Sequence, residues 1–341
     1  MSIITIVGAG MMGSAMSFPL RDNNHEVRLV GTHLDREVIT AVKQTGFHPT
    51  LKRKLPAGIH AFQLEQLEQA LIGVDLIIGG VSSFGIDWFT EKVVPQIPST
   101  KPPVLMVTKG LQELEDGSVQ PFPEHLKKDS SLSFNAIGGP CTSYELADQR
   151  HSAVAFCGDD RSILVRLKGL LETPYYHISL STDVIGVESA VALKNAYALG
   201  ITLAIGQVEK DEGVGCMEAY NPQAAIFGQS TREMTHLVRL FGGKEESLLY
   251  GVSDLYVTVF GGRTRKLGIL LGRGLSFAQA MQELEDITLE SVVITTRIAR
   301  ALRNLAVRGL AKVSDFPLLT HIDQVINQGK LVDIPWKQFY M

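Results

Sequence analysis

Only three cysteines occur in this 341-residue chain, and Cys141, Cys157 and Cys216 lie far apart. Their spacing matches neither a disulfide framework nor a zinc site, so we expect a cytoplasmic, reducing compartment and no metal. The formal net charge of −4 argues against a nucleic-acid-binding surface. Every long apolar run is broken by charge or glycine well short of a membrane span, so we expect no membrane association.

The beginning of the chain carries a nucleotide-binding pattern. Residues 3–7 form an apolar, β-branched run that is typical of a strand buried on both faces. Gly8-Ala9-Gly10-Met11-Met12-Gly13 follows at once, and residues 14–20 continue as a predicted helix despite Pro19. Strand, GxGxxG and helix in this order form the context of a dinucleotide fingerprint. The glycines allow a tight turn, close approach of a pyrophosphate and packing of helix on strand, so we predict an NAD or NADP site.

The second predicted strand, residues 26–30, bears on the choice of cofactor. It ends in Gly31-Thr32-His33, where an Asp or Glu would hold the ribose of NAD. Asp35 lies slightly late for that role, whereas His33 and Arg36 could face a 2′-phosphate. The alternative is that these are ordinary surface residues of a loop. The sequence therefore leaves NAD against NADP open.

Short apolar runs that predict strands recur as far as residue 180, with amphipathic helical patterns between several of them. These runs cover residues 75–81, 104–108, 133–137, 153–157 and 175–180. Such alternation indicates a mostly parallel sheet. Beyond about Thr182 long helical patterns replace the strand signal. We predict an α/β chain, with a Rossmann-type doubly wound dinucleotide-binding domain over 1–183 and an all-helical substrate and catalytic domain over 184–341. Ligands are expected in the cleft where the two meet.

The segment from Gly186 to Leu199 is the most informative for chemistry. It reads as a nearly all-apolar helix that carries Lys194 and Asn195. A helix that is apolar all round is buried, and a buried ammonium is costly unless something compensates. Hydride transfer to a ketone would explain it, because the developing alkoxide needs a proton and positive charge beside it. The structural alternative is a buried ion pair with Asp254 or Glu188.

Other polar residues follow predicted strands or glycine turns. Lys109 comes directly after the strand at 104–108, on the side of a sheet where ligands bind. Asp254 lies in apolar surroundings, where it could tune Lys194 and relay protons. Arg263, at a Gly-Gly turn, is suited to clamping a phosphate or carboxylate, whereas Arg265 is expected at the surface. The glycine-rich segment after the strand at 133–137 is Gly138-Gly139-Pro140-Cys141-Thr142-Ser143.

In their order along nearly the whole chain, these segments resemble the NAD(P)-dependent glycerol-3-phosphate dehydrogenase family. The resemblance rests on the GxGxxG segment, Thr108-Lys109-Gly110, Gly139-Pro140, Gly186-Val187-Glu188, Ala192-Leu193-Lys194-Asn195, Asp254-Leu255 with Thr258, and Gly261-Gly262-Arg263. It implies reversible hydride transfer between sn-glycerol 3-phosphate and dihydroxyacetone phosphate. It also implies a small phosphorylated substrate and a homodimer.

The resemblance implies roles for individual residues as well. Lys194 would be the catalytic lysine, with Lys109 and Asp254 beside it. Arg263 would meet the substrate phosphate. The other substrate contacts implied are Gly139, Asn195, Thr258 and Lys109, and the cofactor contacts implied are the glycine segment, Thr32, His33, Lys109, Ser143, Arg263 and Glu290.

Two departures from the family pattern fall among the substrate residues. Cys141 stands where the family has Ser or Thr, and Thr264 stands where it has Asn. A thiol is a weak hydrogen-bond partner, and each lost bond can cost about 1–3 kcal/mol, so the substrate could differ while the reaction type stays. Two alternatives remain: a dehydrogenase of the same fold acting on another small anionic ketone or hydroxyacid, of 3-hydroxyacid or ketopantoate type, and a non-catalytic dinucleotide-sensing module.

Overall fold

The computed structural model describes residues 1–128, 130–285 and 289–340. The chain forms two compact units, the first from residues 1–109 and 121–184 and the second from residues 110–120 and 185–341. The expected domain boundary at 183/184 compares with an observed one at 184/185. The short segment 110–120, however, is grouped with the later part of the chain, because its contacts are with helices of the second unit.

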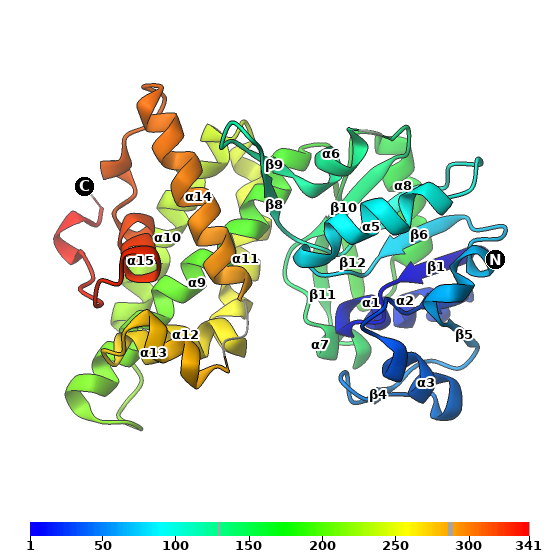
Figure 1. Cartoon of the computed structure of the whole chain (residues 1–341), viewed down its shortest axis with the longest axis horizontal. Coiled ribbons are helices and arrows are strands. Elements are labelled where there is room, and N and C mark those ends of the chain that lie inside the picture. Colours follow the sequence, from blue (N-terminus) through cyan, green and yellow to red (C-terminus); the bar gives the residue numbers. More distant parts are fainter. Residues whose placement is uncertain (129, 286–288, 341) are drawn as a thin grey trace. The chain divides into compact units, whose positions relative to one another are not determined.

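The first unit is built on an eight-stranded sheet with the order β12-β11-β10-β7-β6-β1-β2-β5 (Figure 1). All neighbouring strands are parallel except β10 and β11, which confirms the mostly parallel sheet predicted from the alternation. The strands are β1 (Ile3–Val7), β2 (Glu26–Val30), β5 (Ile59–Phe62), β6 (Leu76–Gly79), β7 (Val104–Met106), β10 (Phe134–Gly138), β11 (Ser152–Cys157) and β12 (Tyr176–Ser181). Because β1 has β2 on one side and β6 on the other, its carboxyl end lies at the switch point where ligands bind such sheets.

Local sequence explains where the helices and strands of this unit depart from expectation. The predicted helix over 14–20 is two helices, and Pro19 lies in the first turn of the second, where its missing N–H removes no hydrogen bond. β5 went unpredicted because this edge strand is only half-buried and lacks an apolar run. The helices are α1 (Met11–Ala15), α2 (Ser17–Asp22), α3 (Arg36–Thr45), α4 (Leu67–Ala70), α5 (Ile86–Lys92), α6 (Phe122–Lys127), α7 (Ser143–Ala147) and α8 (Arg161–Leu171); β3 (Phe47–His48) and β4 (Arg53–Lys54) form a small separate ribbon.

Within residues 110–120, 185–285 and 289–340, the second unit is helical apart from one hairpin and its connecting loops. Its helices are α9 (Val184–Glu212), α10 (Tyr220–Leu240), α11 (Leu248–Thr258), α12 (Gly262–Gly272), α13 (Phe277–Glu283), α14 (Glu290–Val307) and α15 (Pro317–Gln328). The hairpin of β8 (Leu111–Glu113) and β9 (Val119–Pro121) was not foreseen in an all-helical domain. Two arginines of α14 hold it, Arg297 on the carbonyl of Leu111 at 2.6 Å and Arg300 on Glu113 at 2.7 Å.

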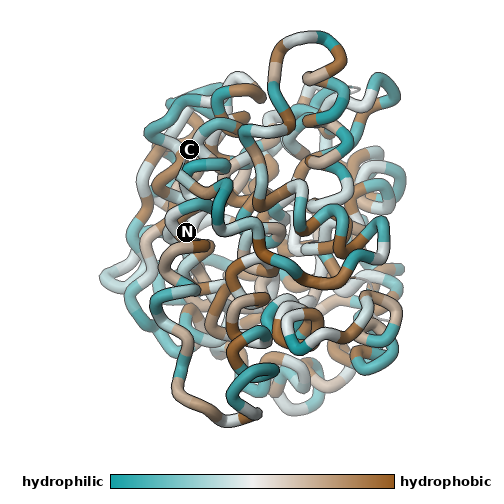
Figure 2. The backbone as a smooth tube through the Cα atoms, turned by 90° about the vertical axis from the view of Figure 1, so that its left-hand side faces the viewer, coloured by the Kyte–Doolittle hydropathy of each residue, from teal (hydrophilic) through white to brown (hydrophobic). Residues whose placement is uncertain are grey.

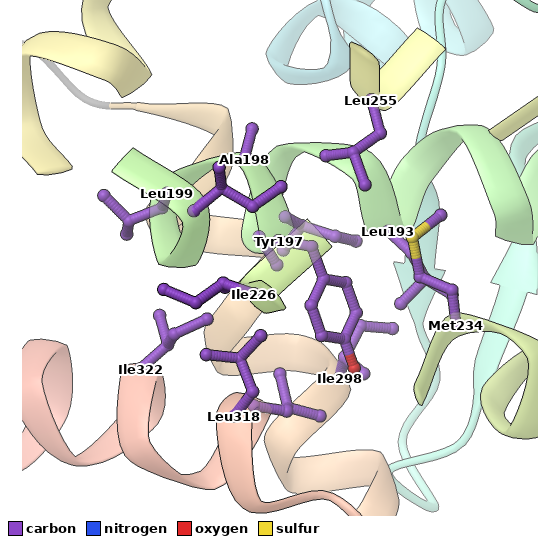
Figure 3. Close-up of a cluster of buried hydrophobic side chains, with 14 of the residues drawn as sticks. Leu193, Tyr197, Ala198, Leu199, Ile226, Met234, Leu255, Ile298, Leu318 and Ile322 are labelled. Atoms are coloured by element: carbon purple, nitrogen blue, oxygen red, sulfur yellow. The ribbon is translucent and has the colours of Figure 1, made fainter. Parts of the chain in front are cut away.

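Helix α9 forms the centre of the second unit. Its length and apolar composition would suffice to cross a membrane, but 83% of its most apolar window is buried inside the protein. Hydrophobic and hydrophilic stretches are interleaved along the chain (Figure 2). In the core around α9, Leu193, Tyr197 and Leu199 lie among side chains from α10, α11, α14 and α15 (Figure 3). The burial is that of a core helix in a globular protein, as the all-round apolar pattern indicates.

Glycines let neighbouring helices approach α9 closely. A Cβ on Gly251 of α11 would lie 2.4 Å from the carbonyl oxygen of Ala190. A Cβ on Gly268 of α12 would lie 2.0 Å from Oγ1 of Thr202. Backbone therefore contacts backbone where larger side chains would hold the helices apart, and α11 in particular is brought against the part of α9 that precedes Lys194.

A buried carboxylate ties α15 to the same core. The oxygens of Glu233 accept from the backbone N–H groups of Leu318 and Leu319, at 2.8 and 3.0 Å, and from the Tyr197 hydroxyl at 3.0 Å. Glu233 thus caps the N-terminus of α15 from another helix. Desolvation by burial raises the pKa of Glu233. We assign this group to structure, since its partners are two helix-end amides and core side chains.

Candidate functional site

The glycines of the first loop divide into structural and ligand-facing positions. Gly8 has φ +111°, and a Cβ there would lie 2.6 Å from the carbonyl carbon of Gly80. A Cβ on Gly13 would lie 2.3 Å from the carbonyl oxygen of Gly8, so α1 packs directly on the turn. At Gly10 the nearest atom to an added Cβ is 3.8 Å away. The fold itself therefore requires glycine at 8 and 13, whereas the bare surface at Gly10 leaves room for a ligand.

A cavity of about 290 Å³ opens beside this loop. A dinucleotide fits these surroundings, because bare backbone at Gly10 and aromatic rings at the cavity wall are what a pyrophosphate and a base require. The sequence analysis did not single out Gly80, Phe84 or Trp88, although the Gly79-Gly80 pair at the end of β6 was a readable signal. The predicted cofactor residues Gly8, Gly10, Thr32 and His33 line the cavity, together with Leu34, Asp35, Gly80, Val81, Ser82, Phe84, Gly85 and Trp88.

Two methionines of the fingerprint lie outside that lining. Met11 and Met12, the first residues of α1, are half-buried and pack against the core of the first unit. The thioether of Met11 is 3.3 Å from the hydroxyl of Tyr144 in α7. At these two positions the structure therefore places core-packing side chains, and a cofactor contact there would have to come from the backbone.

Lys109 and Gly139 lie together at the end of two neighbouring strands. The Lys109 ammonium donates to the carbonyl oxygen of Gly139 at 2.7 Å. Gly139 has φ +113°, and a Cβ there would come within 3.2 Å of the Val154 Cα, so this turn requires glycine. Cys141 is half-buried just beyond it, and Ser143 is buried at the first position of α7. Lys109 and Gly139, which the sequence places after two different strands, are therefore in direct contact.

Lys194 and Asp254 form an ion pair inside the second unit. Nζ of Lys194 lies 2.6 Å from Oδ1 of Asp254, and their side chains are 13% and 4% exposed. Of the two partners considered from the sequence, the structure selects Asp254. The close approach of α11 at Gly251 brings the carboxylate within reach. An ammonium held this way has a fixed direction, which is a property needed beside a developing alkoxide.

The other predicted residues of the second unit gather partly around this pair. Asn195, next to Lys194, has its amide nitrogen 3.5 Å from Oε2 of Glu290, the first residue of α14. Thr258 ends α11, and its hydroxyl donates to the carbonyl oxygen of Asp254 at 2.7 Å. Arg263 is exposed near the start of α12, and Thr264 beside it is half-buried. Lys194 and Asn195 of α9 therefore lie beside Asp254 of α11. The exposed Arg263 follows in the next helix, α12.

Comparisons with known proteins agree with these two halves. Residues 3–163 match the family model described as NAD-dependent glycerol-3-phosphate dehydrogenase N-terminus, and residues 183–335 match the corresponding C-terminus. The chain is 36% identical over 288 residues to the NADP(+)-dependent glycerol-3-phosphate dehydrogenase of Archaeoglobus fulgidus, covering 83% of this chain and 84% of that one. It is 26% identical to the glycerol-3-phosphate dehydrogenase [NAD(P)+] of Myxococcus xanthus over 96% of this chain and 93% of that protein.

Solved structures give the same picture for the fold. Glycerol-3-phosphate dehydrogenase from Coxiella burnetii aligns with a TM-score of 0.79 and 24% identity, over 99% of this chain and 97% of that chain. A ketopantoate reductase from Ralstonia eutropha aligns with a TM-score of 0.59 and 15% identity, over 96% and 99% of the two chains. The fold is thus shared with both enzymes and is more similar to that of the glycerol-3-phosphate dehydrogenase than to that of the ketopantoate reductase.

Proposed function

We propose a reaction for this chain, which belongs to the NAD-dependent glycerol-3-phosphate dehydrogenase family. It interconverts sn-glycerol 3-phosphate and dihydroxyacetone phosphate, with Lys194 as proton donor and acceptor. The protein is an NAD(P)-dependent oxidoreductase acting on a CH–OH group. The observation that carries the role of Lys194 is that its side chain stays 13% exposed while Asp254, which directs it, is 4% exposed, so the ammonium is not sealed in a purely structural ion pair.

When bound, a dinucleotide would supply or accept the hydride in this reaction. When the ketone is reduced, Lys194 donates a proton to the alkoxide oxygen, and its positive charge stabilises that oxygen as charge develops. Asp254 directs the ammonium through the 2.6 Å contact and compensates its charge after burial. In the oxidation direction, the neutral amine form of the same lysine takes the proton from the alcohol and becomes the ammonium again.

The remaining site residues bind and orient the substrate in this proposal. Arg263 carries a guanidinium fork that can bind a phosphate through two hydrogen bonds. Lys109 is directed by the Gly139 carbonyl and adds a second cation for the anionic substrate. Asn195 and Thr258 present an amide and a hydroxyl beside Lys194 and Asp254. Lys109, Ser143, Arg263 and Glu290 are also proposed to contact the cofactor.

Two departures from the family pattern among the substrate residues support a second candidate function. Cys141 and Thr264 replace stronger hydrogen-bonding groups, so another small anionic ketone or hydroxyacid could be the better substrate. The ketopantoate-type alternative is less well supported, because Arg263 follows a Gly-Gly turn suited to phosphate. A dinucleotide-sensing module would leave the partly exposed Lys194 ammonium and Lys109 without a chemical role.

We expect the purified protein to oxidise NADPH or NADH when dihydroxyacetone phosphate is the only ketone. The phosphate is recognised through Arg263, so dihydroxyacetone without phosphate should be used far less efficiently. Loss of absorbance at 340 nm measures the rate, and ketopantoate serves as the competing substrate. Faster turnover of ketopantoate would contradict the proposed substrate, whereas no turnover of any ketone with intact cofactor binding would support the sensing module.

We also propose that the protein is a cytoplasmic homodimer that buries an apolar face of the second unit. Tyr220, Tyr256 and Phe260 are 68%, 59% and 63% exposed and line a cavity of about 580 Å³. Arg265, which we expected at the surface, lines the same cavity half-buried and donates to the Val259 carbonyl at 2.9 Å. An apolar patch of this kind is typical of an interface between proteins.

The dimer is tested by replacing Tyr220 with glutamate. A charge placed in an apolar interface is strongly unfavourable, so the variant should have half the mass of the wild-type particle in light scattering. Val307→Glu is the matched control, since Val307 is 90% exposed and is not among the residues that line this cavity. A wild-type protein that is monomeric at micromolar concentration, or a Tyr220→Glu variant that stays dimeric, would contradict the proposed face.

A further inference from the structure

A buried histidine, His48, lies behind the glycine loop formed by residues 8–13. It ends β3 in the small ribbon, its side chain is fully buried, and both of its ring nitrogens are engaged. Nδ1 accepts a hydrogen bond from the backbone N–H of Leu51 at 3.0 Å, so Nδ1 itself carries no hydrogen. The ring hydrogen is therefore on Nε2, which lies 2.8 Å from the carbonyl oxygen of Ala9. His48 thus donates a hydrogen bond to the backbone of the glycine loop.

The polar backbone groups of the loop divide into those held by the protein and one that is left over. The N–H of Ala9 donates to Oδ2 of Asp35 at 3.1 Å, and the carbonyl of Ala9 accepts from His48. The N–H of Gly10 has no hydrogen-bond partner among the described residues, and Gly10 is exposed at the cavity. Side chains from outside the loop therefore fix Ala9 on both sides, and Gly10 presents the amide that a ligand can use.

The peptide bond between Ala9 and Gly10 carries the effect of His48 to the cavity. This bond is trans, since the described residues contain no cis peptide bond, and the C=O and N–H of a trans peptide point in opposite directions. A carbonyl directed at the buried His48 therefore directs the Gly10 N–H to the exposed side of the loop. Without the imidazole, the buried carbonyl would lose its donor, which is costly, and the peptide could turn over. A carbonyl oxygen would then face an anionic ligand.

We infer that His48 is a positioning residue for the cofactor, because it holds the Ala9–Gly10 peptide with the Gly10 N–H directed at the pyrophosphate. The inference rests on the proposed function only in placing a dinucleotide in the cavity beside Gly10. His48 acts through the loop and is not itself in contact with the dinucleotide or the reacting atoms. Because NADH and NADPH carry the same pyrophosphate, His48 contributes equally to the binding of both and has no influence on the choice between them.

Two variants separate the two hydrogen bonds of the ring. In His48→Asn, the side-chain amide takes the place of Nδ1 and can keep the contact with Leu51, but it is too short to reach Ala9. In His48→Gln, the amide takes the place of Nε2 and can donate to Ala9, but it leaves the Leu51 N–H without its acceptor. Each variant loses one bond, so both should lose similar stability in thermal unfolding. Only His48→Asn should lose affinity for the cofactor.

The experiment is calorimetric titration of the whole protein with NADH and with NADPH, without any ketone. We expect His48→Asn to bind both dinucleotides about 10- to 100-fold more weakly than the wild type, as the loss of a hydrogen bond to a charged group does. His48→Gln should bind both almost as tightly as the wild type. In steady-state kinetics, His48→Asn should show a raised KM for the cofactor and an unchanged kcat at saturating cofactor, because the proton transfer does not involve His48.

His25 provides the matched control within the same unit. It is also a buried histidine, with Nδ1 accepting from the N–H of Ser2 at 3.3 Å and Nε2 lying 3.1 Å from the carbonyl oxygen of Leu170. Ser2 precedes β1 and the glycine loop follows it, so His25 lies at the opposite end of that strand. His25→Asn should therefore lower stability and leave the affinity for both dinucleotides unchanged.

The outcomes separate this inference from the proposed function. A His48→Asn variant that binds both dinucleotides as tightly as the wild type would overturn the inference, and so would a loss confined to one of them. If His48→Asn is too unstable to titrate, His48→Gln decides, since a loss of about tenfold or more in that variant contradicts the role of the Ala9 contact. A wild type that binds neither dinucleotide would refute both the inference and the proposed function. The expected binding changes without turnover of dihydroxyacetone phosphate would support the inference and contradict the proposed substrate.

Discussion

Replacing Lys194 with alanine is expected to lower kcat for dihydroxyacetone phosphate by about 10²–10⁴-fold. The variant removes the proton donor and the positive charge that stabilises the alkoxide. Binding of the dinucleotide should change little, because the cavity beside Gly10 is built from the first unit alone. Steady-state kinetics and calorimetric titration with NADPH measure the two quantities on the same preparation.

The control for this variant must separate chemistry from folding. Lys210→Ala, in the last turn of the same helix α9, removes a lysine that has no place in the proposed site and should leave kcat unchanged. Lys194→Ala leaves Asp254 buried beside a gap, so we expect some loss of stability as well. Lys194→Met keeps most of the side-chain volume and should be as inactive as the alanine variant. Unchanged turnover in either variant would contradict the catalytic role of Lys194.

Replacing Gly251 with alanine is expected to lower both stability and activity. The added Cβ would lie 2.4 Å from the Ala190 carbonyl oxygen, which is closer than real Cβ atoms come, so α11 must move away from α9. Overpacking of this kind typically costs about 1–3 kcal/mol in the free energy of unfolding. Because Gly251 lies one turn before Asp254 and Ala190 one turn before Lys194, the shift also separates the ion pair, and kcat should fall. Urea unfolding and steady-state kinetics measure the two effects.

A second glycine provides the matched control. Gly169 lies exposed within α8, and an added Cβ there would meet nothing within 4 Å. Gly169→Ala should therefore raise the free energy of unfolding by about 0.5–1 kcal/mol, since alanine is the better helix former. Its activity should equal that of the wild type. A Gly251→Ala variant as stable and as active as Gly169→Ala would show that the close approach of α11 to α9 is not required.

Much of the fold could be predicted from local patterns. The fingerprint at residues 8–13 and the alternation of apolar runs predicted the parallel sheet, because each strand buried between helices must be apolar along its length. β5 and the hairpin β8–β9 escaped prediction, since half-buried edge strands and short ribbons have no strong periodicity. The hairpin depends on Arg297 and Arg300, which lie almost two hundred residues further along the chain.

The site shows the same division at the level of single residues. Lys194 was conspicuous because a lysine in an apolar helix demands an explanation, and Asp254 was conspicuous in its apolar surroundings. Their contact remained one of two alternatives, since Glu188 lies on the same helix as the lysine and was equally available in the sequence. Phe84 and Trp88 went unnoticed because nothing about either residue, taken alone, marks it as part of a cavity wall.

The sequence by itself determined the chemistry that this protein can perform. Three features can be read from the residue order whatever the packing. They are a glycine loop between strand and helix, a lysine in an apolar helix and an arginine after two glycines. Only the tertiary structure decided which of these groups meet. Asp254 pairs with Lys194 because Gly251 lets two helix backbones touch, and Lys109 meets the Gly139 carbonyl because β7 and β10 are neighbours in the sheet. Which side chains meet depends on differences of a few tenths of an ångström in the spacing between segments that are far apart in the chain. The order of the residues does not reveal that spacing.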